Sequence, residues 1–198
     1  MLGGTFDPPH LAHLVLAAAA RRALALDRVL FVPAGEPWRK AGRDVSSASA
    51  RVRMVEAAVA ALPWAEVSTI EVERAGPSYS AETMEALAAA HTGGGEPAEW
   101  WFILGSDALA DLPNWHEPAR LLAAARLALI RRPDGDIDVP ATLLSAFPGI
   151  EARIDPVPTP ALDVASTELR ARIRSGRSTQ HLLPEPVRAV IEELGLYW

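Results

Sequence analysis

The chain has 198 residues, 49% of them hydrophobic and 22% charged, a composition that suits one compact domain and excludes disordered, collagen-like and coiled-coil proteins. It has no cysteine and no apolar run near the roughly 20 residues of a membrane helix, which excludes disulfides, thiolate metal sites and a cysteine nucleophile. From the length we expect one domain over residues 1–198, and the lack of cysteine and of a membrane segment fits a cytoplasmic protein. The formal net charge of -6 argues against nucleic acid or a membrane as partner.

Apolar runs of strand length alternate with stretches of helical period, which favours βα units around a parallel sheet. In chain order we expect a helix at residues 11–26, a strand at 29–33, a helix at 48–62, a strand at 67–72, a helix at 80–90 and strands at 100–104 and 127–130. Residues 133–148 are expected to form a loop, and further helices to follow Ser166 and Thr167 and to span 184–194. The predicted fold class is α/β: a doubly wound, mostly parallel Rossmann-like sheet with helices on both faces.

The first strand of such a sheet is expected to be short. A strand usually leads into the first glycine-rich turn of this fold, but only Met1 and Leu2 precede Gly3 and Gly4. The strand is therefore either a stub or begins upstream of the given sequence. We expect the first loop to be held loosely, and the protein to be less active than a version extended upstream.

The most informative segment is Gly-Gly-Thr-Phe-Asp-Pro-Pro-His-Leu-Ala-His, residues 3–13. Its two glycines let the backbone approach a ligand, and the segment leads into a helix whose first amides can face phosphate oxygens. His10 and His13 are three residues apart, so their N–H groups can donate to a polyphosphate from one helical face. The alternatives are a capped helix with two surface histidines, and a metal pair, which lacks a third ligand at characteristic spacing.

This segment resembles the signature of the nucleotidylyltransferases with an HxGH motif, with Ala12 where the family has glycine. Further segments resemble the nicotinate-nucleotide adenylyltransferase branch, in the family's order: residues 32–37 with Lys40, 74–83, 104–108, Trp115, 131–133, 164–170 and 183–197. The resemblance implies transfer of adenylate from ATP to nicotinate mononucleotide, giving nicotinate adenine dinucleotide and pyrophosphate for NAD biosynthesis. It implies direct in-line attack without a covalent enzyme intermediate, and Mg²⁺ arriving with ATP.

The resemblance also implies roles for single residues. It makes His10, His13 and Arg170 catalytic. The residues it places at ATP are Gly4, Thr5, Phe6, His10, His13, Gly105, Asp107, Ser166, Thr167 and Arg170. Those it places at the mononucleotide are Lys40, Tyr79, Ser80, Thr83, Trp115 and Arg132. No protein ligand for the metal is implied.

Two alternatives stay open from the sequence. A phosphopantetheine adenylyltransferase or a related cytidylyltransferase would share both phosphate-binding motifs, although Trp115 and the Ser-Tyr turn favour nicotinate. A catalytically silent nucleotide-binding protein is compatible with Ala12, and with Ala165 where the family often has serine. The sequence is compatible with a homo-oligomer but does not fix the oligomeric state.

Overall fold

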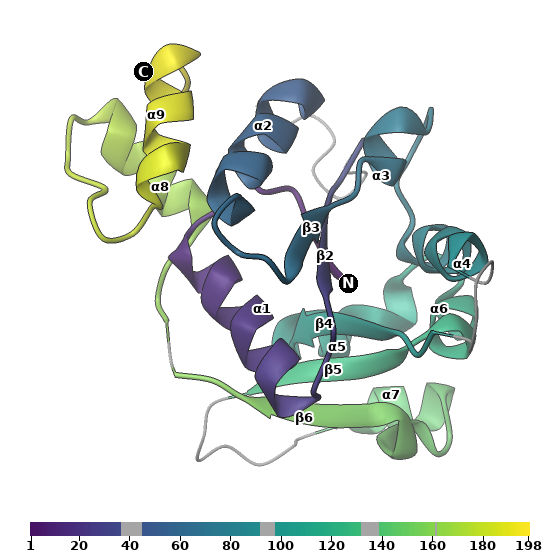
Figure 1. Ribbon diagram of the computed structural model, residues 1–198. Coiled ribbons are helices and arrows are strands. Elements are labelled where there is room, and N and C mark those ends of the chain that lie inside the picture. The colour runs from purple at the N-terminus through teal and green to yellow at the C-terminus, as the bar shows by residue number, and fades with distance from the viewer. Residues whose placement is uncertain (37–44, 92–97, 132–138, 161) are drawn as a thin grey trace.

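The computed structural model describes residues 1–36, 45–91, 98–131, 139–160 and 162–198. Its strands form two parallel three-stranded sheets, β1-β2-β3 and β4-β5-β6 (Figure 1). The first sheet contains β1 (Leu2–Gly4), β2 (Val29–Pro33) and β3 (Ala65–Val67). The second contains β4 (Trp101–Gly105), β5 (Arg126–Arg131) and β6 (Ile154–Pro158).

Backbone hydrogen bonds join the two sheets at β1 and β4. The Met1 amino group donates to the Trp101 carbonyl at 2.6 Å, and the Ile103 amide donates to the Met1 carbonyl at 2.9 Å, which is the pattern of parallel neighbours. The spatial order is therefore β3-β2-β1-β4-β5-β6. In a doubly wound sheet with this order, ligands bind beyond the carboxyl ends of the strands, where the order reverses. That point lies between β1 and β4.

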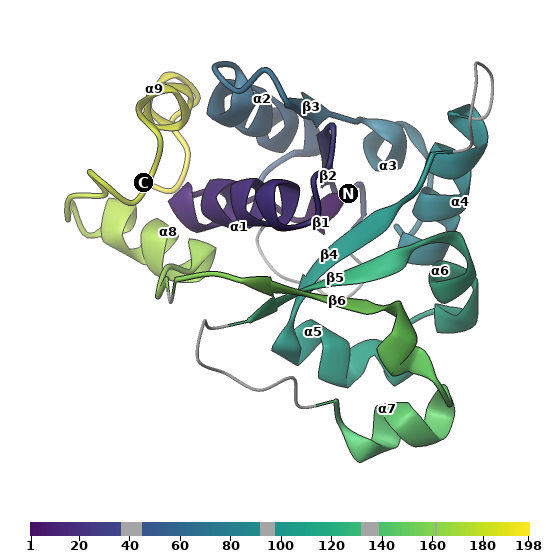
Figure 2. The same ribbon diagram turned by 60° about the horizontal axis from the view of Figure 1, so that its bottom comes forward.

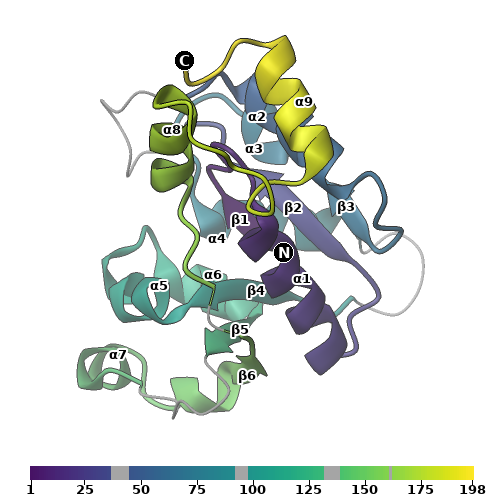
Figure 3. The same ribbon diagram turned by 90° about the vertical axis from the view of Figure 1, so that its left-hand side faces the viewer.

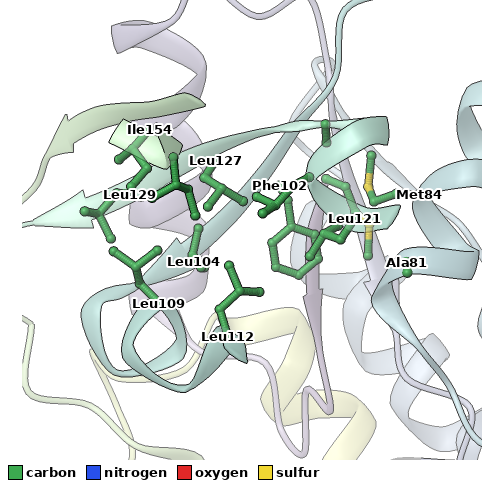
Figure 4. Close-up of a cluster of buried hydrophobic side chains, with 14 of the residues drawn as sticks. Ala81, Met84, Phe102, Leu104, Leu109, Leu112, Leu121, Leu127, Leu129 and Ile154 are labelled. Atoms are coloured by element: carbon green, nitrogen blue, oxygen red, sulfur yellow. The ribbon is translucent and has the colours of Figure 1, made fainter. Parts of the chain in front are cut away.

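Alternate side chains of the strands enter two cores, one on each face. Val29 and Phe31 of β2 belong to one cluster of buried side chains, whereas Leu30 and Val32 belong to the other. The first cluster packs against α1 (Leu11–Ala23), α2 (Ala48–Val59), α8 (Ser166–Arg174) and α9 (Glu185–Glu193). The second packs against α4 (Ser80–Ala90), α5 (Ser106–Asp111), α6 (Pro118–Ala124) and α7 (Ala141–Ala146), and Figure 4 shows part of it. Figure 2 shows α1 and α5 on opposite faces of β4 and β5.

The α/β class and three of the four predicted strands are confirmed, and β1 has three residues within the given sequence. The prediction of a strand at residues 67–72 was wrong, because β3 ends at Val67 and α3 (Ile70–Glu73) follows. The Ser68 amide donates to the Phe31 carbonyl at 2.9 Å, after which the chain turns away from β2. Spaced apolar residues in so short a stretch fit either a strand or a helix.

The sequence analysis missed several elements, the strand β6 and the helices α5, α6 and α7 among them. The strand β6 contains Pro156 and Pro158, and proline usually argues against a strand. Among the described residues β6 pairs only with β5, so it is an edge strand, which tolerates proline. Helix α7 lies inside the stretch predicted as a loop, and its Leu143 is fully buried in the core. The short turns η2 (Leu112–Asn114) and η3 (Ile150–Arg153) complete the elements of the described residues. In the same residues no helix has the length and apolar character needed to cross a bilayer.

Candidate active site

A cleft of about 810 Å³ lies at the switch point of the sheet. One wall is the start of α1, and another is the turn from β4 into α5. Four of the residues predicted to bind ATP line this cleft: His10, His13, Gly105 and Asp107. A Cβ at Gly105 would meet no atom within 4 Å, so the backbone there is open to a ligand. The fold thus brings two motifs, almost 100 residues apart, to one cavity.

The two histidines stack at the start of α1. Their ring centroids are 3.8 Å apart with an interplanar angle of 28°, and the Phe6 ring meets His13 edge-on at 5.0 Å. The His10 amide donates to Nδ1 of His13 at 3.1 Å, so a neutral His13 has its proton on Nε2. Burial lowers the pKa of His10 to about 4, which keeps that ring neutral at pH 7. His10 therefore offers an N–H donor rather than a fixed positive charge.

Gly4 and Phe6 shape the loop that precedes these histidines. Phe6 is 2% exposed and has φ of 51°, a left-handed conformation that costs free energy in a residue other than glycine. A Cβ at Gly4 would lie 3.2 Å from the Phe6 ring, so the glycine makes room for that ring. The structure gives Gly4 a packing role, and a direct contact between Gly4 and ATP stays a prediction.

The start of α8 lies against the same loop. The Ser166 hydroxyl donates to the Pro8 carbonyl at 2.9 Å, and Nη1 of Arg170 donates to the Asp7 carbonyl at 2.6 Å. The Ser166 hydroxyl proton is therefore used within the protein, which leaves the amides of Ser166 and Thr167 at the helix start for an anion. The two phosphate-binding motifs predicted from the sequence, 158 residues apart at this contact, are neighbours.

Arg51, a buried arginine that the sequence analysis did not identify, holds the backbone of the loop before α1. Arg51 of α2 is 2% exposed, and its guanidinium donates to the carbonyls of Thr5, Ala34, Gly35 and Ser46 at 2.6–3.1 Å. Burial lowers the pKa of Arg51, but an arginine still stays charged at neutral pH. The expectation of a loosely held first loop disagrees with these bonds and with those to α8. Nothing in the sequence distinguishes Arg51 from a surface arginine of an amphipathic helix.

Of the described residues predicted at the mononucleotide, neither Tyr79, Ser80 and Thr83 nor Trp115 lines this cleft. Tyr79 stacks on His116 with ring centroids 3.9 Å apart, and Trp115 meets Phe102 edge-on at 5.7 Å. Nε1 of Trp115 donates to the Asp111 carboxylate at 3.2 Å. Ser80 is the first residue of α4, so its amide belongs to a helix start. Lys40 and Arg132 lie outside the described residues.

The placement of Thr83 disagrees with the prediction that it contacts the mononucleotide. Its side chain is fully buried, and its hydroxyl donates to Glu71 at 2.7 Å and accepts from Arg74 at 2.6 Å. Burial raises the pKa of the Glu71 carboxyl, while the hydrogen bond from Thr83 opposes that rise. Thr83 therefore stabilises the loop before α4. Its hydroxyl could reach a ligand only by breaking these hydrogen bonds.

The match to known proteins extends along the whole chain. Residues 1–175 match the family model described as cytidylyltransferase-like, so the chain belongs to the cytidylyltransferase-like family. A probable nicotinate-nucleotide adenylyltransferase of Roseiflexus sp. (strain RS-1) is 45% identical over 197 residues, which cover 100% of this chain and 96% of the relative. A second probable nicotinate-nucleotide adenylyltransferase, from Herpetosiphon aurantiacus, is 42% identical, and the match again covers 100% of this chain and 96% of the relative. Within the family, the chain is thus a nucleotidyltransferase of the nicotinate-nucleotide adenylyltransferase group.

Solved structures with much lower identity share the fold. The nicotinic acid mononucleotide adenylyltransferase of Plasmodium falciparum in complex with NaAD superposes with a TM-score of 0.75 at 18% identity. The match covers 99% of this chain and 95% of that chain. The predicted fold class, family and enzyme class are confirmed.

Proposed function

We propose that ATP binds in the cleft and nicotinate mononucleotide binds beside it, so that the phosphate of the mononucleotide attacks the α-phosphorus of ATP in line. One bond forms between that phosphate oxygen and the α-phosphorus, and the bond from the α-phosphorus to the bridging oxygen of pyrophosphate breaks. The products are nicotinate adenine dinucleotide, a precursor of NAD, and pyrophosphate. No protein group is bonded to the substrate at any stage, and residues 1–198 act as one domain.

The observation on which this proposal rests is the contact between the starts of α1 and α8. Among the described residues, the amides of Ser166 and Thr167 at the start of α8 have no hydrogen-bond acceptor, and helix N-termini favour anions. At the start of α1 the amides of Leu11 and His13 already donate to the carbonyls of Leu182 and His10, so the donors that this helix offers are the histidine side chains. The bonds from Ser166 to Pro8 and from Arg170 to Asp7 hold the two helix starts together. A triphosphate lying across both would be positioned before the reaction, which can lower a barrier by about 7–11 kcal/mol in favourable cases.

The histidines supply hydrogen bonds to the charge that develops on the phosphates. His13 has Nδ1 occupied by the His10 amide, so Nε2 is the nitrogen that donates to an oxygen of the α-phosphate or of the departing pyrophosphate. The stacked, neutral His10 fixes the orientation of the His13 ring and can donate to the same anion. Arg170 adds a positive charge from the second motif.

The remaining parts of the substrates are assigned by position. Asp107 lies in the cleft beside the open backbone of Gly105 and would accept hydrogen bonds from the ribose hydroxyls of ATP. Trp115 would stack on the nicotinate ring, and the amides at Tyr79 and Ser80 would bind its carboxylate. Lys40 and Arg132 are proposed to contact the mononucleotide on the resemblance alone.

Magnesium is proposed to arrive as part of the substrate, MgATP. Within the described ranges no group of three or more acidic or histidine side chains could hold a metal ion. The ion would be held mainly by phosphate oxygens and water, as Mg²⁺ commonly is in nucleotide sites. Bound in this way, the ion would neutralise charge on the leaving pyrophosphate.

The test is incubation with ATP, Mg²⁺ and either nicotinate or nicotinamide mononucleotide, followed by chromatography of the dinucleotide product. We expect the nicotinate product, with slower formation of the amide. Phosphopantetheine with ATP, and a small alcohol phosphate with CTP, complete the panel. Faster pyrophosphate release with either would favour the other cytidylyltransferase-like activities, and binding of ATP without release from any pair would favour a silent nucleotide-binding protein.

A further inference from the structure

Asp7, in the loop before α1, joins two distant parts of the chain. Its carboxylate is buried, with the residue 2% exposed, and accepts a 2.5 Å hydrogen bond from the Tyr197 hydroxyl. Tyr197 follows α9, which packs against α2 beside α8 in Figure 3. The Ser46 amide approaches the other carboxylate oxygen at 3.4 Å. Burial, followed by the bond to Asp7, raises the pKa of Tyr197, so its hydroxyl stays protonated and donates.

The same aspartate contacts Arg170. Nη1 of Arg170 donates to the Asp7 carbonyl at 2.6 Å and lies 3.7 Å from Oδ2 of the carboxylate. Arg170 is only partly buried, with 22% of its side chain exposed. In the part of the chain that the structure describes, its other guanidinium nitrogens have no hydrogen bond, so they are available to an anion. The orientation of Asp7 therefore decides how much of the guanidinium a phosphate can use.

We infer that Tyr197 is a positioning residue for ATP: by holding the carboxylate of Asp7, it keeps the guanidinium of Arg170 directed to the phosphates. This inference rests on the proposed function, because it assumes that Arg170 binds the triphosphate. The Tyr197 hydroxyl occupies Oδ1, and Arg170 stays at 3.7 Å from Oδ2, outside direct hydrogen-bond distance. Without the Tyr197 hydroxyl, the buried Asp7 carboxylate would lack a hydrogen-bond donor. It would then accept a hydrogen bond from Arg170, the nearest charged group, and the guanidinium would turn away from the phosphates.

The test is Tyr197→Phe, which keeps the ring and removes the donor. We expect KM and Kd for MgATP to rise about fivefold to tenfold, within the range of one ordinary hydrogen bond, because the effect on ATP is indirect, while KM for nicotinate mononucleotide changes less than twofold. The control is Trp198→Ala, since Trp198 is 70% exposed and lies next to Tyr197 in the chain. This variant should keep both constants. A Tyr197→Phe protein with a lower Tm but unchanged constants for ATP would overturn the inference.

A double-mutant cycle separates positioning from local packing. In an Arg170→Ala background, adding Tyr197→Phe should leave the Kd for MgATP within twofold, because the group that it positions is gone. If the rise in Kd for the double variant equals the product of the rises in the two single variants, Tyr197 acts independently of Arg170, and the inference is overturned. Binding is measured by titration with a non-hydrolysable ATP analogue. Absence of turnover in the wild type would thus contradict the proposed function, while the binding cycle still decides the role of Tyr197.

Discussion

The two halves of the proposed active site, the ATP side and the mononucleotide side, are built differently. On the ATP side, backbone carbonyls of the first loop are held by Arg51, Ser166 and Arg170, so the backbone that we propose to bind phosphate is fixed before a ligand arrives. On the mononucleotide side, the aromatic side chains meet through ring contacts, as between Tyr79 and His116. A ring stack can be exchanged for a stack on a ligand at small cost, whereas a buried hydrogen-bond network cannot. The comparison predicts large effects from changes on the first side and small ones on the second.

The largest effect is expected from Arg51→Met. Four carbonyls, in three segments, would lose their donor inside the protein, which should lower the free energy of unfolding by about 3–5 kcal/mol. The measurement is urea unfolding. Arg53→Met is the matched control, because Arg53 is on the same helix but forms an exposed ion pair with Glu193 and should cost less than about 1 kcal/mol. Equal losses in the two variants would show that the network does not hold the loop.

Next in size is His13→Ala. If His13 donates to the reacting phosphates, kcat should fall about 100-fold to 1000-fold, while the Kd for ATP changes less than tenfold. Pyrophosphate release gives kcat, and titration gives the Kd. His91→Ala, at the end of α4, is the control and should keep its turnover. Parallel losses of binding and turnover would instead make His13 a binding residue only.

The buried His10 predicts a pH dependence of stability. In the unfolded chain this ring takes up a proton near pH 6.5, but in the folded protein only near pH 4. Its contribution is therefore complete above pH 6.5 and is lost as the pH falls from 6.5 towards 4, by at most about 3 kcal/mol. Unfolding of the wild type and of His10→Gln should be compared between pH 4 and pH 7. Parallel curves for the two proteins would mean that the folded ring titrates like a free histidine.

The smallest effect belongs to the mononucleotide side. Trp115→Leu should raise KM for nicotinate mononucleotide about threefold to tenfold, the range of one aromatic stack, and leave KM for ATP unchanged. Trp115→Phe keeps a flat ring and should recover most of the affinity. Steady-state kinetics with each substrate varied in turn provides the test. A rise in both KM values would indicate that Trp115 acts through the packing of its ring on Phe102.

Local sequence patterns predicted most of the ATP side. Glycine, histidine and helix-start hydroxyls have strong local signals, so His10, His13, Ser166 and Thr167 could be proposed without a structure, and their contacts with ATP stay predictions. The contribution of Arg51, Asp7 and Tyr197 depends on burial and on partners up to 190 residues away, which no local pattern contains. The strand β6 was missed because proline excludes a central strand but not an edge strand. Thr83 was assigned to the mononucleotide because the motif does not show that its hydroxyl points into the protein.

The most direct test of the account is a crystal structure with a non-hydrolysable ATP analogue and nicotinate mononucleotide. We expect one triphosphate to contact Nε2 of His13 and the amides of Ser166 and Thr167 at the same time, with the mononucleotide phosphate opposite the leaving pyrophosphate. A triphosphate bound to one of these helix starts while the other faces solvent would contradict the account.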